Sequence, residues 1–345
     1  MSEAILRPAA LDEDDARDVY LKSFLQPFAR WLHDHDTMEI MVNRPGEVWI
    51  ETAGADAMTR AEDPAITDQL LQRLATQIAR VSHQAVNREN PLLAATLPGG
   101  ERVQIVAPPA AGDSWVLSIR RHVVADLNLA DFAGREGFQS VAIQKPDGLS
   151  EADQKLAALL KGRHIDAFLS SAVKTRKTIL ISGGTSTGKT SLLNALLREV
   201  HAGERIVTVE DSREVRLVQP NSVNLVAVKG VMGEARIEVT DLLQAALRLR
   251  PDRIILGEVR GPEASTFLRA INTGHPGSIS TVHADSPEGA LEQLALMILQ
   301  AGLGLSRSET IDYILSIVDV IVQLRRKNGR RVIERVFFKP MESQF

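Results

Sequence analysis

The spacing of apolar residues predicts that the chain begins with a small α+β domain. Over residues 19–35 apolar side chains recur at helical intervals, which predicts an amphipathic helix docked on its own domain. Two short strands then flank a turn at residues 44–46, and residues 66–82 again have helical periodicity. The segments ERVQIVAPP and WVLSIRRH have the pattern of strands. We therefore expect an N-terminal α+β domain over residues 1–125.

A second pattern begins after a region without a clear period. Residues 126–150 contain three glycines and a proline, and we expect them to connect two domains, with Phe132 and Phe138 as anchors. From there to about Ser316 helical and strand-like segments alternate, which predicts a mostly parallel sheet. Residues 151–345 are therefore expected to form an α/β domain.

Two local signals shape the end of that domain. Ser306-x-x-Glu309 is a capping box, which predicts a helix through about Ser316. The segment VDVIVQLRRKNGRRVIERVFF predicts a β-hairpin, in which Asn328-Gly329 forms the turn.

The segment ISGGTSTGKT lies between a strand-like run, TILIS, and a helix-like run, SLLNALLREV. Its pattern is that of a phosphate-binding loop, in the strand–loop–helix setting that the motif needs. Glycines let the backbone N–H groups approach phosphate oxygens, and the helix dipole favours the anion. Lys189 would reach the β- and γ-phosphates of ATP, and the Thr190 hydroxyl would ligate Mg²⁺. The predicted nucleotide contacts here are Gly183, Gly184, Thr185, Ser186, Thr187, Gly188, Lys189, Thr190 and Ser191.

An acidic segment after the next predicted strand could contribute a carboxylate to the hydrolysis of the nucleotide. Residues 205–209 have the pattern of a strand, and Glu210, Asp211 and Glu214 lie at or past its carboxyl end. Open parallel sheets bind ligands at that end of their strands. A carboxylate placed there can orient the attacking water. An acidic loop exposed to solvent is the ordinary alternative, which the position after a strand makes weaker.

A further short strand is predicted over residues 254–256, and Glu258 comes just after it. The stretch resembles a Walker B strand, in which an aspartate usually helps to hold Mg²⁺. Gly257 stands where that aspartate would be, so Glu258 is the candidate for this role, directly or through water.

Two histidines flank a predicted strand over residues 278–282. A histidine at such a strand end can sense or donate to a γ-phosphate. A structural hydrogen bond is the common role of a single histidine. The two roles are evenly balanced for His275, and the functional one is favoured for His283.

Arginines could complete the site, because a guanidinium matches phosphate geometry. Arg102, Arg120, Arg121 and Arg260 are the candidates. The Arg120–Arg121 pair ends a strand shortly before the predicted connection, so it could reach a nucleotide between domains. Arg120 is preferred over Arg121, although alternation alone does not settle which of them points inward.

Composition and charge narrow the function classes. Forty basic and 44 acidic residues give a net charge of −4, so the surface as a whole lacks the excess of positive charge typical of nucleic-acid-binding proteins. The absence of cysteine excludes disulfides, zinc–thiolate sites and cysteine nucleophiles. The N-terminus does not resemble a secretory signal, and no apolar run is long enough to span a bilayer. A soluble intracellular protein is expected.

The motifs together resemble a known superfamily. GGTSTGKTS, VEDSREVRL, RPDRIILGEVRGPEA and INTGHPGSISTVHADSPEGALEQLALM follow the order of the Walker A, Asp-box, Walker B and His-box segments of bacterial secretion ATPases. The long TGHPGSISTVHA form looks most like the hexameric traffic ATPases of type IV secretion and conjugation systems. LPGGERVQIVAPP and LSIRRH also look like that family's N-terminal domain, so the resemblance covers most of the chain.

The resemblance implies an α/β P-loop domain of the RecA-like kind, a smaller N-terminal α+β domain and Mg²⁺-dependent ATP hydrolysis. It assigns catalysis to Glu210, Glu258, His283 and Lys189, and metal binding to Thr190 and Glu258. The resemblance matches Arg102 and Arg120 to phosphate-sensing arginines of the N-terminal domain, and Arg260 stays a candidate nucleotide contact from the residues themselves. It further implies a homo-hexamer at the cytoplasmic face of the inner membrane, partners in the secretion machine, and no sequence-specific nucleic-acid binding.

Other functions stay open at this point. A pilus assembly or retraction motor, or a type II secretion ATPase, belongs to the same superfamily, although type II enzymes commonly carry a four-cysteine zinc module. A nucleic-acid translocase is disfavoured by the charge balance and by an aromatic content of 4%. A nucleotide-binding scaffold without turnover is disfavoured by Lys189, Glu210 and Glu258.

Overall fold

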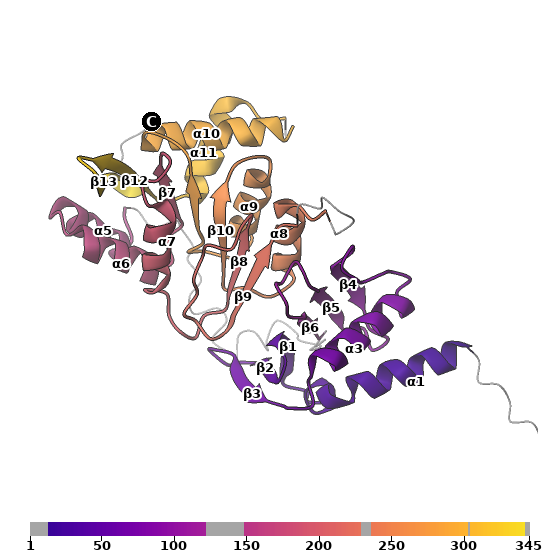
Figure 1. Ribbon diagram of the computed structural model, residues 1–345. Coiled ribbons are helices and arrows are strands. Elements are labelled where there is room, and N and C mark those ends of the chain that lie inside the picture. The colour runs from indigo at the N-terminus through magenta and orange to yellow at the C-terminus, as the bar shows by residue number, and fades with distance from the viewer. Residues whose placement is uncertain (1–12, 122–147, 229–235, 303, 342–345) are drawn as a thin grey trace, which may run out of the picture. The chain divides into compact units, whose positions relative to one another are not determined.

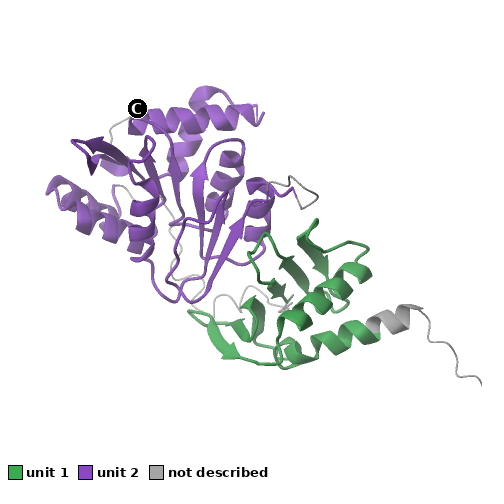
Figure 2. Ribbon diagram, viewed as in Figure 1, with its two compact units in different colours: residues 1–122 green, residues 123–345 purple. Residues whose placement is uncertain are grey.

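The computed structural model describes residues 13–121, 148–228, 236–302 and 304–341. The chain divides into two compact units, Met1–His122 and Val123–Phe345 (Figure 2). The first unit stops close to the predicted limit of the α+β domain. Most of the predicted connection, residues 126–150, lies outside the described residues, and so do its two proposed anchors, Phe132 and Phe138.

The first unit is an antiparallel sheet in the order β3-β2-β1-β6-β5-β4 (Figure 1). Its strands are β1 (Thr37–Arg44), β2 (Glu47–Thr52), β3 (Thr59–Glu62), β4 (Leu92–Thr96), β5 (Arg102–Val106) and β6 (Val116–Arg120). Its helical segments are α1 (Glu13–Leu25), η1 (Gln26–Phe28), α2 (Ala29–Leu32) and α3 (Asp68–Val81).

Helix α3 confirms the helical periodicity of residues 66–82. Thr67 caps its start, since the Thr67 side chain accepts a hydrogen bond from the backbone N–H of Leu70. One face of the helix then carries Leu71, Leu74, Ala75, Ile78 and Ala79, which are buried in the core of the unit. This core also contains side chains from α1 and from five of the strands.

The N-terminal helix differs from its prediction. A single helix was expected over residues 19–35, whereas α1 begins at Glu13 and ends at Leu25, and the 3₁₀ turn η1 separates it from α2. Pro27 lies at the start of that turn, where its missing N–H and fixed φ interrupt α-helical hydrogen bonding. Leu21 and Phe28 enter the core as expected of a docked helix, but Tyr20 is exposed.

The sequence pattern did not reveal strands β3 and β4. Both are edge strands of the six-stranded sheet, and each is only four or five residues long. Edge strands bury little of their surface, so β3 (TRAE) carries no apolar alternation that a sequence pattern could detect.

The second unit contains the predicted sheet, in the order β13-β12-β7-β11-β10-β8-β9. All neighbouring strands are parallel except β12 and β13, which form the predicted hairpin. The strands are β7 (Ile179–Gly183), β8 (Ile206–Glu210), β9 (Ser222–Val226), β10 (Arg253–Val259), β11 (Ile279–Val282), β12 (Val320–Lys327) and β13 (Arg330–Phe338).

The helices of this unit fall into two groups that contact one another within each group (Figure 1). The first group is α5 (Glu151–Lys161), α6 (Ile165–Lys174) and α7 (Lys189–Leu197), which share one apolar core with the central strands. The second is α8 (Val239–Leu247), α9 (Glu263–Asn272), α10 (Pro287–Gln300) and α11 (Arg307–Ile317), and the short turn η2 (Lys339–Met341) ends the described chain.

Two local predictions for this unit are confirmed, and one is wrong. The capping box of Ser306 and Glu309 opens α11, and Asn328 and Gly329 form the hairpin turn with φ values of 50° and 76°. Glu258 was expected to follow its strand, but β10 extends to Val259 and includes it.

No helix among the described residues has the length and apolar character needed to cross a bilayer.

A buried arginine anchors the start of β10. Arg253 is 1% exposed, and its guanidinium donates two hydrogen bonds to Glu204, at 2.8 and 2.9 Å, and one to the carbonyl of Gly277. Burial opposes ionisation of Glu204, but the hydrogen bonds and charge of Arg253 leave the pKa of Glu204 below its usual range. The pair therefore ties β10 to the loop that precedes β8.

Replacing Arg253 by alanine is expected to lower the free energy of unfolding by about 3–5 kcal/mol, because a buried guanidinium is lost and the charged Glu204 keeps only the more exposed Arg176 as a partner. Urea denaturation of the full chain measures this. Arg325→Ala is the matched control, since Arg325 is 62% exposed and its ion pair with Glu334 is expected to contribute at most about 1 kcal/mol. Equal losses in the two variants would contradict this structural role.

Candidate nucleotide-binding site

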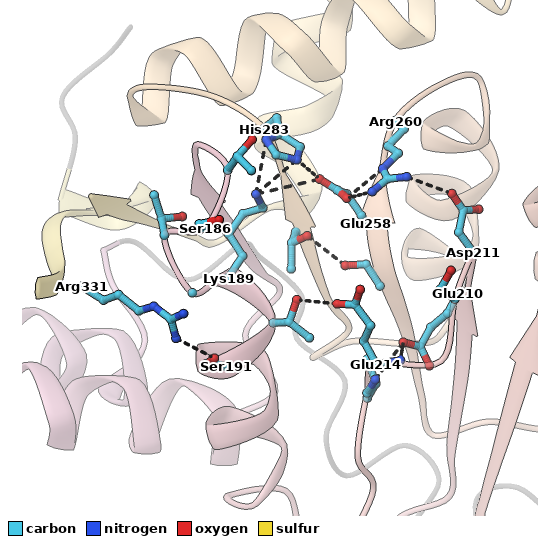
Figure 3. Close-up of a pocket in the computed structure, with 18 residues that line it drawn as sticks. Ser186, Lys189, Ser191, Glu210, Asp211, Glu214, Glu258, Arg260, His283 and Arg331 are labelled. Atoms are coloured by element: carbon cyan, nitrogen blue, oxygen red, sulfur yellow. Dashed lines mark hydrogen bonds and ion pairs between the residues drawn. The ribbon is translucent and has the colours of Figure 1, made fainter. Parts of the chain in front are cut away.

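A pocket opens at the carboxyl ends of strands β7, β8, β10 and β11 of the second unit (Figure 3). Its lining includes the phosphate loop, the acidic segment after β8, the end of β10 and the histidine after β11. The sequence-predicted residues that line it are Thr185, Ser186, Thr187, Gly188, Lys189, Thr190, Ser191, Glu210, Glu258, Arg260 and His283. Segments far apart in the sequence thus meet at one edge of the sheet.

The phosphate loop has the local geometry that its sequence predicts. It connects Gly183, the last residue of β7, to Lys189, the first residue of α7. Gly188 caps the helix with φ of 96°, a left-handed conformation that a side chain disfavours. The N-terminal turn of α7 lines the pocket, where its backbone N–H groups can donate hydrogen bonds to an anion.

Lys189 lies inside the pocket and is only 9% exposed. Its Nζ donates to the carbonyls of Gly183 and Gly184, at 3.0 and 3.3 Å, and lies 3.9 Å from Glu258 Oε1. Burial lowers the pKa of Lys189; the charge of Glu258 opposes this shift and that of Arg260 adds to it. A phosphate oxygen in the pocket would stabilise the charged form of this ammonium, which burial disfavours.

Glu258 is the centre of a chain of polar and charged groups (Figure 3). Its Oε1 lies 2.6 Å from His283 Nε2, and its Oε2 accepts a hydrogen bond of 2.8 Å from Arg260 Nε. Arg260 Nη1 also contacts Asp211 Oδ2 at 3.2 Å. The side chain of His283, 47% exposed, lies at the mouth of this arrangement. The structure thus brings together three of the predicted site residues through one carboxylate.

Glu210 lies deeper and holds its own loop in place. It is 2% exposed, and its Oε1 accepts hydrogen bonds from the backbone N–H groups of Glu214 and Val215, at 2.9 and 2.8 Å. Burial raises the pKa of Glu210, and these two hydrogen bonds only partly offset that shift. Its Oε2 is buried without a hydrogen-bond partner in the part of the chain that the structure describes.

The missing Walker B aspartate has a steric explanation. A Cβ atom at Gly257 would lie 3.1 Å from Cγ of Glu210. An aspartate at this position would therefore press a second carboxylate against a buried one. Glycine leaves the space that Glu210 occupies.

Thr190 and Glu214 bring two oxygen atoms together beside the phosphate loop. The Thr190 hydroxyl donates to Glu214 Oε2 at 3.1 Å. A hydroxyl and one carboxylate beside a phosphate loop fit Mg²⁺, which takes oxygen ligands and usually binds few protein groups together with phosphates. Among the described residues, no cluster of three or more His, Cys, Asp or Glu side chains could hold a metal ion by itself.

The three candidate arginines of the first unit lie on or next to strands β5 and β6. Arg102 and Arg120 are cross-strand neighbours on β5 and β6, and Arg120 Nε lies 3.6 Å from Glu39. The Arg120 side chain is 67% exposed. The neighbouring Arg121 instead donates to the backbone carbonyls of Asp34 and Thr37, which gives it a structural role.

His275 has a structural role as well. Its Nδ1 lies 2.8 Å from the carbonyl of Ala270 in the last turn of α9, and it does not line the pocket.

Two pocket residues of interest, Glu214 and Arg331, were not among the site residues assigned from the sequence. Glu214 was named in the acidic segment together with Glu210 and Asp211, but only Glu210 was assigned a role. Arg331 comes from the C-terminal hairpin, where the run RRKNGRR gives no sign that one of its arginines reaches the phosphate loop.

A mostly parallel sheet, helices in two groups and a phosphate loop facing carboxylates define a P-loop nucleotide-hydrolase domain. Comparison with known proteins agrees. A family model described as "Type II/IV secretion system protein" matches residues 23–337. The chain therefore belongs to the type II/IV secretion system protein family.

Within this family, the chain is similar to several type IV secretion system proteins. The chain is 36% identical to the type IV secretion system protein VirB11 of Bartonella quintana over 93% of each protein. It is 40% identical to the type IV secretion system protein PtlH of Bordetella pertussis over 96% of each. It also matches a crystal structure of the VirB11 ATPase of the Brucella suis type IV secretion system in complex with sulphate. That match has a TM-score of 0.88 and 34% identity, and it covers 95% of this chain and 97% of the other. These findings confirm the resemblance and the fold class predicted from the sequence.

Proposed function

We propose that this chain is an ATP-hydrolysing motor of a type IV secretion system, in which the pocket beside α7 binds and cleaves ATP. The observation that carries the proposal is the placement of Glu258 beside Lys189 at the phosphate loop, with Nζ and Oε1 3.9 Å apart. A P-loop lysine binds the β- and γ-phosphates. A carboxylate at this distance can therefore face the bond that is cleaved.

The charge of the pocket supports a requirement for Mg²⁺. Its cationic side chains are Lys189, Arg260 and Arg331, whereas its four carboxylates are Glu210, Asp211, Glu214 and Glu258. Acidic groups thus outnumber basic ones before a highly charged triphosphate is added. A divalent cation between the phosphates and the Thr190–Glu214 pair offsets this repulsion.

Within this site we assign Glu258 to the attacking water. Its carboxylate can accept a proton from water beside the γ-phosphate; Arg260 donates to one of its oxygens, and His283 Nε2 lies 2.6 Å from the other. Arg260 keeps the Glu258 and Asp211 carboxylates together and can turn toward a phosphate oxygen, because its side chain is 59% exposed. Lys189 stabilises the charge that develops on the transferred group.

For Glu210, which the sequence predicts to be catalytic, the contacts support a positioning role. Glu210→Gln is expected to lower kcat less than about 10-fold, because the glutamine oxygen can still accept from both backbone N–H groups. Glu210→Ala is expected to lose more, since it releases the loop that carries Glu214. Steady-state ATPase assays of both variants measure this. A loss of 10²–10⁴-fold in the glutamine variant, typical of a missing general base, would restore the catalytic role.

The pH dependence of folding stability tests the burial of the Glu210 carboxyl independently of ATPase activity. Because burial raises the pKa of the Glu210 carboxyl above its ordinary value, the stability contributed by its neutral form is lost as pH rises through that raised pKa. The stability of Glu210→Gln relative to the parent chain is therefore expected to increase with pH. Urea midpoints at pH 5 and pH 8 measure the difference, and a decrease would contradict the assignment.

We propose the family's assembly for this chain as well: a homo-hexamer that works with other components of the secretion machine, including inner-membrane proteins, and attaches peripherally to the cytoplasmic face of the membrane. Arg102 and Arg120 are proposed to complete the nucleotide site. The exposed position of Arg120 leaves its guanidinium accessible for this purpose.

ATP turnover and oligomeric state, measured together, test the proposal. The purified full chain is expected to hydrolyse ATP only with Mg²⁺ present and to form a hexamer in light scattering with nucleotide. Absence of turnover in a nucleotide-bound hexamer, with lipid present, would leave only a binding scaffold. Strong stimulation of turnover by single-stranded DNA would instead favour a nucleic-acid translocase.

A further inference from the structure

The C-terminal hairpin brings an arginine to the phosphate loop. Strand β12 pairs in parallel with β7, and its Leu324 lies opposite Gly183, the last residue of β7. Strand β12 then continues to Lys327, and the hairpin returns along β13 from Arg330. The hairpin tip therefore extends past the carboxyl edge of β7, beside the loop that follows it.

Arg331 makes the contact between the hairpin and the loop. A Cβ atom at Gly188 would lie 2.8 Å from Arg331 Cδ, so the arginine stem packs directly over this glycine. Arg331 Nη1 lies 3.4 Å from Ser191 Oγ in the first turn of α7 (Figure 3). The side chain also lines the nucleotide pocket.

Some cations of the hairpin have carboxylate partners: Arg325 and Lys327 both pair with Glu334, and Arg335 pairs with Glu288. Within the described part of the chain, Arg326, Arg330 and Arg331 form no ion pair, and of these three only Arg331 lines the pocket. A guanidinium that rests on an anion-binding loop without an anion of its own is suited to a phosphate oxygen of the ligand.

The position along the loop indicates which phosphate this is. A P-loop lysine reaches the β- and γ-phosphates, and the next residue serves Mg²⁺. Arg331 lies on the other side of Lys189 from Glu258 and Arg260, next to Ser191 (Figure 3). We propose that Arg331 binds the α-phosphate end of the nucleotide, away from the bond that is cleaved. This inference rests on the proposed function, because it needs a nucleotide in this pocket.

Such a contact should act on binding and not on chemistry. ATP and ADP share the α-phosphate, so loss of Arg331 removes the same interaction from both. Arg331→Gln is expected to raise Kd for ADP and KM for ATP by a similar factor, roughly 10-fold, and to change kcat by less than about 2-fold. Arg331→Lys, which keeps the charge but not the planar fork, is expected to lie between glutamine and the parent.

The control is Arg330→Gln. It removes the same charge one residue earlier, on the opposite face of β13, and Arg330 does not line the pocket. The experiment uses the full chain with Mg²⁺: calorimetric titration with ADP and with a non-hydrolysable ATP analogue, together with steady-state kinetics. Thermal melting without nucleotide checks that both variants fold.

The outcomes separate this inference from the proposed function. Equal ADP affinities for the parent, Arg331→Gln and Arg330→Gln would overturn the inference and leave the ATPase intact. A loss for the ATP analogue but not for ADP would place Arg331 at the γ-phosphate and overturn the assignment. A parent chain that binds neither nucleotide would overturn the proposed function and this inference with it.

Discussion

Lys189→Ala is expected to lower kcat/KM for ATP by at least about 10²–10³-fold, the usual cost of removing a group that stabilises transition-state charge. The Lys189 side chain is 9% exposed, so water cannot easily take its place. Burial already lowers the pKa of Lys189, which shows that the folded protein holds this charge at a cost. We therefore expect this charge to serve a bound anion more than folding stability. Steady-state kinetics with Mg²⁺ and ATP measure the effect.

Lys161→Ala is the matched control for that variant. Lys161 is an exposed residue at the end of α5 and does not line the pocket, so the control should keep the parent rate. Thermal melting of both proteins distinguishes a catalytic loss from unfolding. A parent rate in Lys189→Ala would show that the phosphate loop does not hold the reacting nucleotide.

Glu258→Gln is expected to lower kcat by about 10²–10⁴-fold while leaving ADP affinity within a few fold of the parent value. Glutamine has the size of glutamate and can still accept a hydrogen bond from Arg260, but it cannot take a proton from water. The result separates proton transfer from positioning, which truncation to alanine would not do. Single-turnover kinetics and ADP titration give the two quantities.

Glu292→Gln provides the control for this change. Glu292 lies on α10, pairs with Arg307 and does not line the pocket, so its loss of charge should not alter turnover. If Glu258→Gln kept kcat within about 3-fold of the parent, another group would have to orient the water. Glu210 would then be the next candidate.

Much of this site could be read from the sequence because its signals are local. The strand, loop and helix around Lys189 are contiguous, and each acidic or histidine segment follows its own apolar run. Parallel strands bring their carboxyl ends to one edge, so an alternating pattern alone was enough to predict that these segments meet. The fold class and the hairpin turn followed in the same way.

The contacts that the sequence did not reveal connect residues with no local signature. Arg331 lies 140 positions after Ser191, and its contact depends on how far β12 runs past β7. The approach of Gly257 to Glu210 likewise depends on the packing of β10 beside β8. Edge strand β3 was missed because it lacks apolar alternation. The interruption of the N-terminal helix at Pro27 was missed because the apolar spacing of residues 19–35 continues across it.

The ion pairs that link Lys189, Arg260, Glu258 and Asp211 also bear on how ionic strength affects this protein. A triphosphate that enters the pocket exchanges internal partners of these cations for its own oxygens, so few dissolved ions are displaced. Added salt screens the old pairs and the new ones alike. Nucleotide affinity should thus vary less with salt concentration than the number of cations in the pocket would suggest.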